Sequence, residues 1–186
     1  SDFMAKVTGE VLRKSGHDVY MMTSDSSAFD ASLFGRVSAC ARGIYSRSAR
    51  REMREVIEDF SPDIVHVHEV YPAHSPWVLR DCRAAGVPVV MTCHDFRVTC
   101  PISTHISHGQ PCNRCTYGST MSCFTQNCRD NRMESAAFAL RAGVAKSFDL
   151  FHENVDLFLA PSQFIEQRMI DSGIAADKLR VVPNMV

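Results

Sequence analysis

Titratable side chains follow two apolar stretches of this chain. Residues 87–93 read Val-Pro-Val-Val-Met-Thr-Cys and run directly into His94 and Asp95, and residues 63–68 lead in the same way into Glu69. Both stretches have the length and β-branched content of short buried strands. Ligands bind just outside the carboxyl ends of the strands in an open α/β sheet. We therefore expect a site at this edge, where a neutral imidazole that can donate and accept hydrogen bonds lies beside a carboxylate.

The same residues also have structural interpretations. His94 and Asp95 can simply cap their strand and the loop that follows. His68 and Glu69, at the end of the neighbouring strand, can line the same cleft. Strand alternation puts His66 and His68 on one face, and His66 is more often a satisfied core histidine than a ligand.

Strands and helices alternate along the sequence. The hydrophobic pattern predicts helices over 1–16, 47–60, 75–86, 134–152 and 162–172, strands over 18–22, 63–68, 87–93, 156–160 and 178–182, and a polar loop over 23–35. Ser75 and Ser162 are the expected N-caps of their helices. This order predicts an α/β fold, a Rossmann-like open parallel sheet with helices on both faces. The chain has no GxGxxG sequence, so a dinucleotide-dependent oxidoreductase is poorly supported.

Composition excludes several other classes of protein. Of the 186 residues, 45% are hydrophobic, which is too many for a disordered chain. The net charge of −1 does not indicate the broadly basic surface of a nucleic-acid-binding protein. The basic residues between Arg47 and Arg54 alternate with acidic ones, which predicts the solvated face of a helix. No apolar run is long enough for a transmembrane helix.

Eight cysteines raise a separate question about metal binding. Cys82 and Cys93 fall inside predicted elements and are expected to be buried apolar groups, and Cys40 has no partner nearby in sequence. The other five lie in one irregular segment over 94–131, too long for an ordinary connection: Cys100, Cys112, Cys115, Cys123 and Cys128. The C-x2-C and C-x4-C spacings suit a structural zinc held by four of the five, with Cys112 and Cys115 favoured alongside two of Cys100, Cys123 and Cys128, and with His105 and His108 as spare ligands. Disulfides, redox thiols and unligated thiols remain alternatives.

The order of several motifs resembles that of a known family. The segments are SGHDVYMMT, PDIVHVHEVYP, SPWVLRDCRAAGVPVVMTCHDFRVTCP and FLAPSQFIEQRMIDSGIAADKLRVVPNMV. Together they are similar to the N-terminal domain of family 4 glycosyltransferases, whose GT-B fold has two Rossmann-like domains facing across a cleft. Some members carry a similar Cys-rich insertion after the His-Asp strand.

The resemblance implies a domain division. Residues 1–183 would form the acceptor-side domain without its first strand, with a Cys-rich insertion at about 96–131. Residues 184–186 would begin the interdomain linker. The C-terminal domain, which supplies most donor contacts in the family, would be absent, so this fragment alone is expected to be inactive.

The resemblance also implies a reaction. A hexosyl group would pass with retention of configuration from a nucleotide-sugar donor to a glycan, lipid-linked or small-molecule acceptor. His94 matches the family's histidine near the transferred sugar. Asp95 would orient the His94 ring or accept a hydrogen bond from a hydroxyl of the acceptor molecule. Tyr71 would stack on a sugar ring. Transfer would need no cofactor. A cytoplasmic location is expected, with peripheral membrane contact if the acceptor is lipid-linked.

Other classes of function stay open at this point. One is a non-catalytic Rossmann-like binding module with a structural zinc knuckle. Another is a GT-B-like sugar-nucleotide epimerase or a phosphorylase, although no phosphate or pyridoxal phosphate site is apparent.

Overall fold

The computed structural model describes residues 2–23, 33–72 and 74–184. The helices are α1 (Asp2–Lys14), α2 (Leu33–Ile44), α3 (Arg47–Phe60), α4 (Trp77–Ala84), α5 (Arg114–Tyr117), α6 (Ser122–Thr125), α7 (Arg132–Ser147) and α8 (Gln163–Asp171). The strands are β1 (Val65–Val67), β2 (Val89–Thr92), β3 (Ile106–Ser107), β4 (Gln110–Pro111), β5 (Leu157–Ala160) and β6 (Leu179–Val181), the last preceded by a 3₁₀ turn over Ala176–Lys178. No helix in the described ranges is long and apolar enough to cross a membrane.

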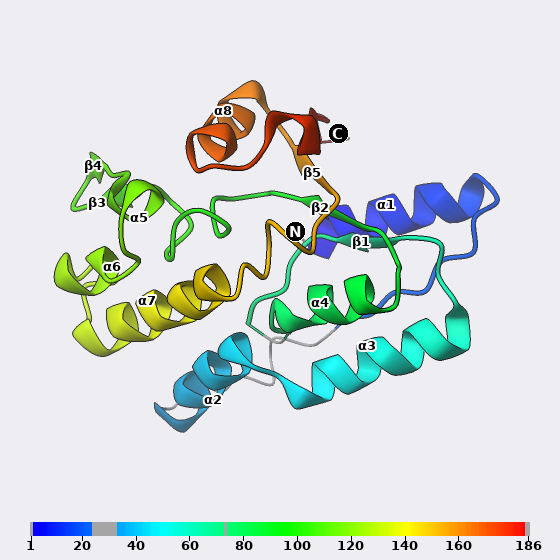
Figure 1. Cartoon of the computed structure of the whole chain (residues 1–186), viewed down its shortest axis with the longest axis horizontal. Coiled ribbons are helices and arrows are strands. Elements are labelled where there is room, and N and C mark those ends of the chain that lie inside the picture. Colours follow the sequence, from blue (N-terminus) through cyan, green and yellow to red (C-terminus); the bar gives the residue numbers. More distant parts are fainter. Residues whose placement is uncertain (1, 24–32, 73, 185–186) are drawn as a thin grey trace.

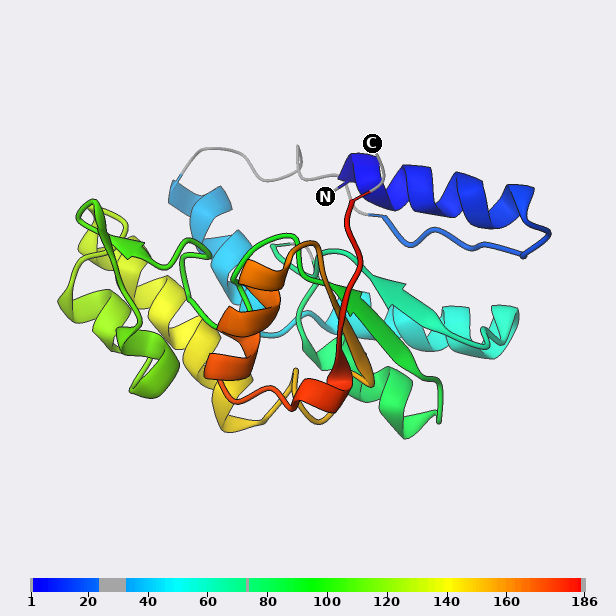
Figure 2. The same ribbon diagram turned by 90° about the horizontal axis from the view of Figure 1, so that it is seen from above.

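Four strands form one parallel sheet in the order β1-β2-β5-β6. Val67 pairs with Met91, and Thr92 pairs with Leu159, so the carboxyl ends of β1, β2 and β5 lie at the same edge. Helices flank the sheet, and Figure 2 shows α1 on one side of the strands and α4 on the other. The predicted α/β class, an open Rossmann-like parallel sheet, is confirmed.

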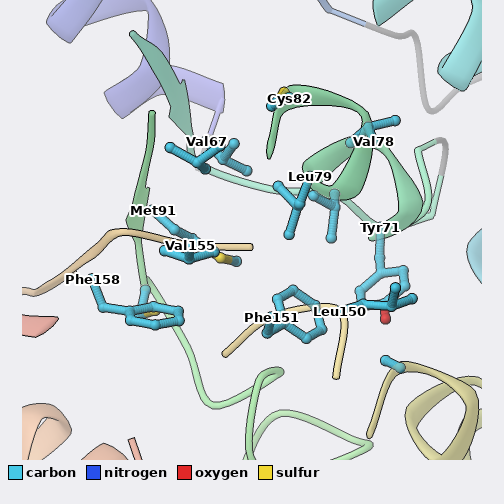
Figure 3. Close-up of a cluster of buried hydrophobic side chains, with 14 of the residues drawn as sticks. Val67, Tyr71, Val78, Leu79, Cys82, Met91, Leu150, Phe151, Val155 and Phe158 are labelled. Carbon is cyan, nitrogen blue, oxygen red and sulfur yellow. The ribbon is translucent and has the colours of Figure 1, made fainter. Parts of the chain in front are cut away.

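The core lies between the sheet and the helices that connect its strands (Figure 3). Leu79 and Cys82 of α4 pack towards Val89 of β2 and Phe158 of β5, and all four side chains are fully buried. The turn after α7 adds Leu150 to the same cluster. The two predicted buried thiols, Cys82 and Cys93, both lie in this core.

Helix α3 joins the core through an apolar side and an ion pair. The Ser46 hydroxyl caps the helix by accepting from the Ala49 backbone N–H. On its basic face, Arg50 donates two hydrogen bonds of 2.7 Å to the buried carboxylate of Asp81, and Arg54 approaches the same carboxylate at 3.2 Å. The predicted solvated face holds for Arg47, Arg51 and Arg54, which are exposed, whereas Arg50 is half-buried because it neutralises the buried carboxylate on α4.

Three local predictions differ from the structure. Residues 18–22 form no strand and pair with none of the described sheet; Arg13 donates instead to the Val19 carbonyl at 2.9 Å. Residues 33–35, expected in a loop, begin α2, while residues 24–32 of that loop lie outside the described part. The Ser75 hydroxyl caps no helix, because it accepts from the Ser46 backbone N–H across the core at 3.1 Å.

The segment between β2 and α7 folds beside the sheet (Figure 1). It contains the antiparallel hairpin β3–β4 and the two short helices α5 and α6. Helix α6 packs on α7, which in turn packs on α2. This insertion therefore rests on a long helix that reaches back to the main core.

The buried side chain of Leu79 gives a direct test of this core. Replacing it with Ala removes fully buried apolar atoms from between α4 and the sheet and should lower the free energy of unfolding by about 2–5 kcal/mol. Leu140→Ala on α7 is the matched control, because Leu140 is 55% exposed and its loss should cost within about 0.5 kcal/mol. Urea unfolding followed by circular dichroism measures both, and equal effects would contradict the assigned core.

Candidate functional site

Two histidines meet where β1 and β2 end. His68 comes directly after the last residue of β1, and Cys93 separates His94 from the last residue of β2. The parallel register of the two strands brings the two histidines together. His68 Nδ1 and His94 Nε2 lie 3.0 Å apart and share a hydrogen bond, and the two rings are stacked with centroids 5.3 Å apart. Since one nitrogen must donate and the other accept, this bond couples the tautomers of the two rings.

A third imidazole extends the group along β1. The ring of His66 lies 4.4 Å from that of His68, as strand alternation predicts, and His66 Nε2 is hydrogen-bonded to Thr92 Oγ1 at 2.8 Å. Burial lowers the pKa of all three histidines, and the mutual repulsion of protonated rings adds to this effect for His66 and His68. The pKa of His68 falls to about 4. The three rings are therefore neutral near pH 7, and each offers one donor and one acceptor.

Arg97 ties the two strand ends together electrostatically. Its guanidinium lies 2.7 Å from Glu69 Oε1 and 2.7 Å from Asp95 Oδ2, while Asp95 Oδ1 accepts from the Arg97 backbone N–H. Burial raises the pKa of Glu69, and the charge of Arg97 opposes that rise. Asp95 does not orient the ring of His94 as predicted, because its carboxylate is occupied by Arg97; His94 has His68 as its ring partner.

These residues line one shallow hollow that is open to solvent. Its lining includes the four predicted polar residues His68, Glu69, His94 and Asp95, together with Arg97. His94 is only half-buried here, and within the described part of the chain its Nδ1 has no hydrogen-bond partner. A small polar molecule in the hollow could therefore reach a neutral imidazole, two carboxylates and a guanidinium.

Tyr71 also lines the hollow but does not present its ring for stacking. The side chain is only 6% exposed, Arg141 lies over the ring at 3.9 Å from its centroid, and Phe151 meets it edge-on. Burial raises the pKa of the phenol. The predicted stacking of Tyr71 on a sugar ring is therefore wrong for this arrangement, and Tyr71 acts as part of the wall.

The five clustered cysteines line a second, small hollow inside the insertion. This hollow brings together Cys100, Cys112, Cys115, Cys123 and Cys128, with His105 among the other lining residues. All eight cysteines of the chain are free thiols. Across residues 2–23, 33–72 and 74–184, no three His, Cys, Asp or Glu side chains are already arranged to hold a metal ion.

The two spare metal ligands are engaged elsewhere. His105 Nε2 is hydrogen-bonded to Thr99 Oγ1 and its Nδ1 to the Cys112 carbonyl. His108 Nε2 is hydrogen-bonded to the Gln126 carbonyl. Both imidazoles are therefore held by other partners, and the thiols remain as the available metal-ligating groups of this hollow.

Comparison with known proteins decides the family. The model of Glycosyltransferase Family 4 matches residues 5–186. The chain belongs to glycosyltransferase family 4. Family membership supports a glycosyltransferase-type function that involves a sugar donor and a sugar acceptor. No curated protein and no solved structure matches the chain.

Two arginines of this family 4 domain were missed by sequence reasoning. Arg97 bridges Glu69 and Asp95, and Arg141 covers Tyr71. The Asp-x-Arg spacing of 95–97 could have predicted the ion pair of Arg97 with Asp95, because a turn brings the two side chains together. Arg141 is contributed by α7 and has no comparable signal in the sequence near Tyr71.

The depressed pKa of His68 can be measured directly. NMR titration of the labelled histidine rings should place the His68 transition near pH 4, below the ordinary value of 6.5. Between these two pH values the unfolded chain binds a proton at His68 that the folded chain does not, so this residue makes stability fall as the pH falls. His68→Gln should reduce that pH dependence of unfolding. A His68 transition at or above pH 6.5 would contradict the neutral histidine group.

Proposed function

We propose that this domain forms the acceptor side of a retaining hexosyltransferase that takes its sugar from a nucleotide-sugar donor. Residues 1–183 would be the N-terminal half of a GT-B enzyme, and the donor would be held mainly by a C-terminal domain. The proposed acceptor is a glycan, a lipid-linked sugar or a small hydroxyl compound. The proposal includes a cytoplasmic location, with peripheral membrane contact for a lipid-linked acceptor.

The observation that carries this proposal is the position of His94. It stands at the carboxyl end of a central strand, lines the hollow, and has one ring nitrogen held by His68 and the other without a described partner. A ring fixed in this way can hydrogen-bond a hydroxyl of the transferred sugar or of the acceptor. An enzyme accelerates group transfer through such positioned hydrogen bonds when they are stronger in the transition state than in the bound substrate.

The charges of the hollow suit a hydroxyl-rich ligand better than a diphosphate. Its lining holds the carboxylates of Glu69 and Asp95 and the guanidinium of Arg97, which is already paired with both. The histidines there are neutral near pH 7 because burial lowers their pKa values. Stabilisation of the departing diphosphate therefore has to come from another part of the enzyme. This supports the assignment of the domain to the acceptor side.

Substitution of His94 tests the proposal. In the intact protein, His94→Ala should lower nucleoside diphosphate release from its nucleotide-sugar donor about 10²-fold or more, because a positioned group in the transition state is lost. The assay screens UDP-, GDP- and ADP-linked hexoses first and then compares variants on the active donor. His17→Ala is the matched control, since His17 is an exposed histidine that does not line the hollow.

Two results would contradict the proposal. Activity of His94→Ala equal to that of the wild type would remove His94 from the reaction. Failure of the intact wild-type protein to release nucleoside diphosphate from any donor, with or without sugar acceptors, would favour the alternative of a non-catalytic binding module.

A further inference from the structure

The insertion over residues 96–131 has an unusual interior. All of these residues are described, and none of their Leu, Ile, Val, Phe or Met side chains is buried. The buried side chains are those of Thr99, Cys100, Pro101, His105, Ser107 and Cys123. Large apolar side chains such as Ile106, Tyr117 and Met121 are instead exposed. The segment therefore lacks the hydrophobic core that would normally hold a hairpin and two helices in place.

A segment without such a core needs another source of stability. Units this small are commonly held by disulfides or by a structural metal. The backbone adds to the requirement, because Ser103, His105, His108, Asn127 and Asp130 all have positive φ angles between 47° and 67°. Non-glycine residues adopt that conformation at a cost, which the surrounding structure must offset.

The thiols are the groups that meet at the centre of the insertion. Five residues spread from Cys100 to Cys128 in the sequence line one hollow. Cys123 is only 1% exposed and Cys100 only 9% exposed, so these two thiols are enclosed within the insertion. Isolated buried cysteines occur elsewhere in this protein, as Cys82 and Cys93 show, but each of those is surrounded by apolar core residues.

We infer that this cluster is a structural zinc site in which four thiolates hold one Zn²⁺. Cys100 and Cys123 are the two buried thiols of the hollow and would be ligands, and two of Cys112, Cys115 and Cys128 would complete the set. Zinc takes four thiolates in a tetrahedron with Zn–S distances of about 2.3 Å. Side-chain rotations would have to bring the sulfurs together around the ion. Each ligand thiol loses its proton to solvent on binding, so occupancy falls at low pH.

One hydroxyl is placed to support a thiolate, because Ser107 Oγ lies 3.7 Å from Cys128 Sγ. The Cys115 thiol donates to the Thr120 carbonyl at 3.8 Å, a bond that it gives up when it loses its proton to bind the metal. A hydroxyl that donates to a ligand sulfur stabilises the thiolate and fixes its orientation. The Ser107 hydroxyl is buried beside the cluster and can play this part for Cys128.

A zinc ion here would also fix the loop that carries Arg97. Cys100 lies three residues after Arg97, and the carbonyl of its neighbour Pro101 accepts from Arg141. On the other side of the insertion, Arg168 of α8 donates to Asn113. The ion would hold the insertion against the edge of the sheet, at a distance from the reacting groups. This inference stands independently of the proposed function.

Metal analysis of the intact protein tests the inference. Protein purified under reducing conditions without added metal should contain about one zinc per chain, and a strong chelator should release it and raise the number of thiols that react with a disulfide reagent. Cys123→Ser should abolish the stoichiometric zinc. Cys40→Ser is the control, because Cys40 is a half-buried thiol outside the cluster and its loss should leave the zinc content unchanged.

A second measurement covers the case in which Cys123→Ser fails to fold. Cobalt added to the wild-type apoprotein should produce the absorption bands of a tetrahedral cobalt–thiolate complex, and zinc should displace them. The inference would be overturned by wild-type protein with no bound metal and all five cluster thiols reacting freely. Disulfides among these cysteines, or iron with the visible absorption of an iron–sulfur cluster, would overturn it equally.

Discussion

The parallel pairing of β1 with β2 is the constraint on which the rest of the site depends. Val67 lies opposite Met91, so the residues that follow the two strands emerge at the same edge and His68 can meet His94. A shift of one residue in this register would turn every side chain of the shifted strand to the opposite face of the sheet. The buried side chains of Val67 and Met91 hold the register, because both are needed in the core.

Burial then determines the chemistry that this edge can offer. The three imidazoles are kept neutral because charging one of them would cost desolvation and repulsion from its neighbours. Among the described residues of the lining, Arg97 carries the one permanent positive charge, and its guanidinium is shared between two carboxylates. The result is a polar hollow in which neutral imidazole donors and acceptors lie beside two carboxylates that share one guanidinium.

The sequence predicted the features that depend on local patterns. The apolar runs located β1 and β2, and alternation correctly put His66 on the same face as His68. Features that depend on distant partners were missed. Tyr71 is buried because Arg141, seventy residues away, covers its ring. The sequence pattern assigned no element to Gly43, which belongs to α2, where a Cβ would come within 3.0 Å of Arg141 and 3.4 Å of Tyr71.

The account rests most directly on the coupling between His68 and His94. A double-mutant cycle in the intact protein, with His68→Gln and His94→Ala measured by nucleoside diphosphate release, tests it. If His68 acts by orienting the ring of His94, the double variant should be no slower than His94→Ala alone. If the fold-losses in rate of the two single variants multiply in the double variant, the two residues act independently. That result would contradict the view that one imidazole positions the other.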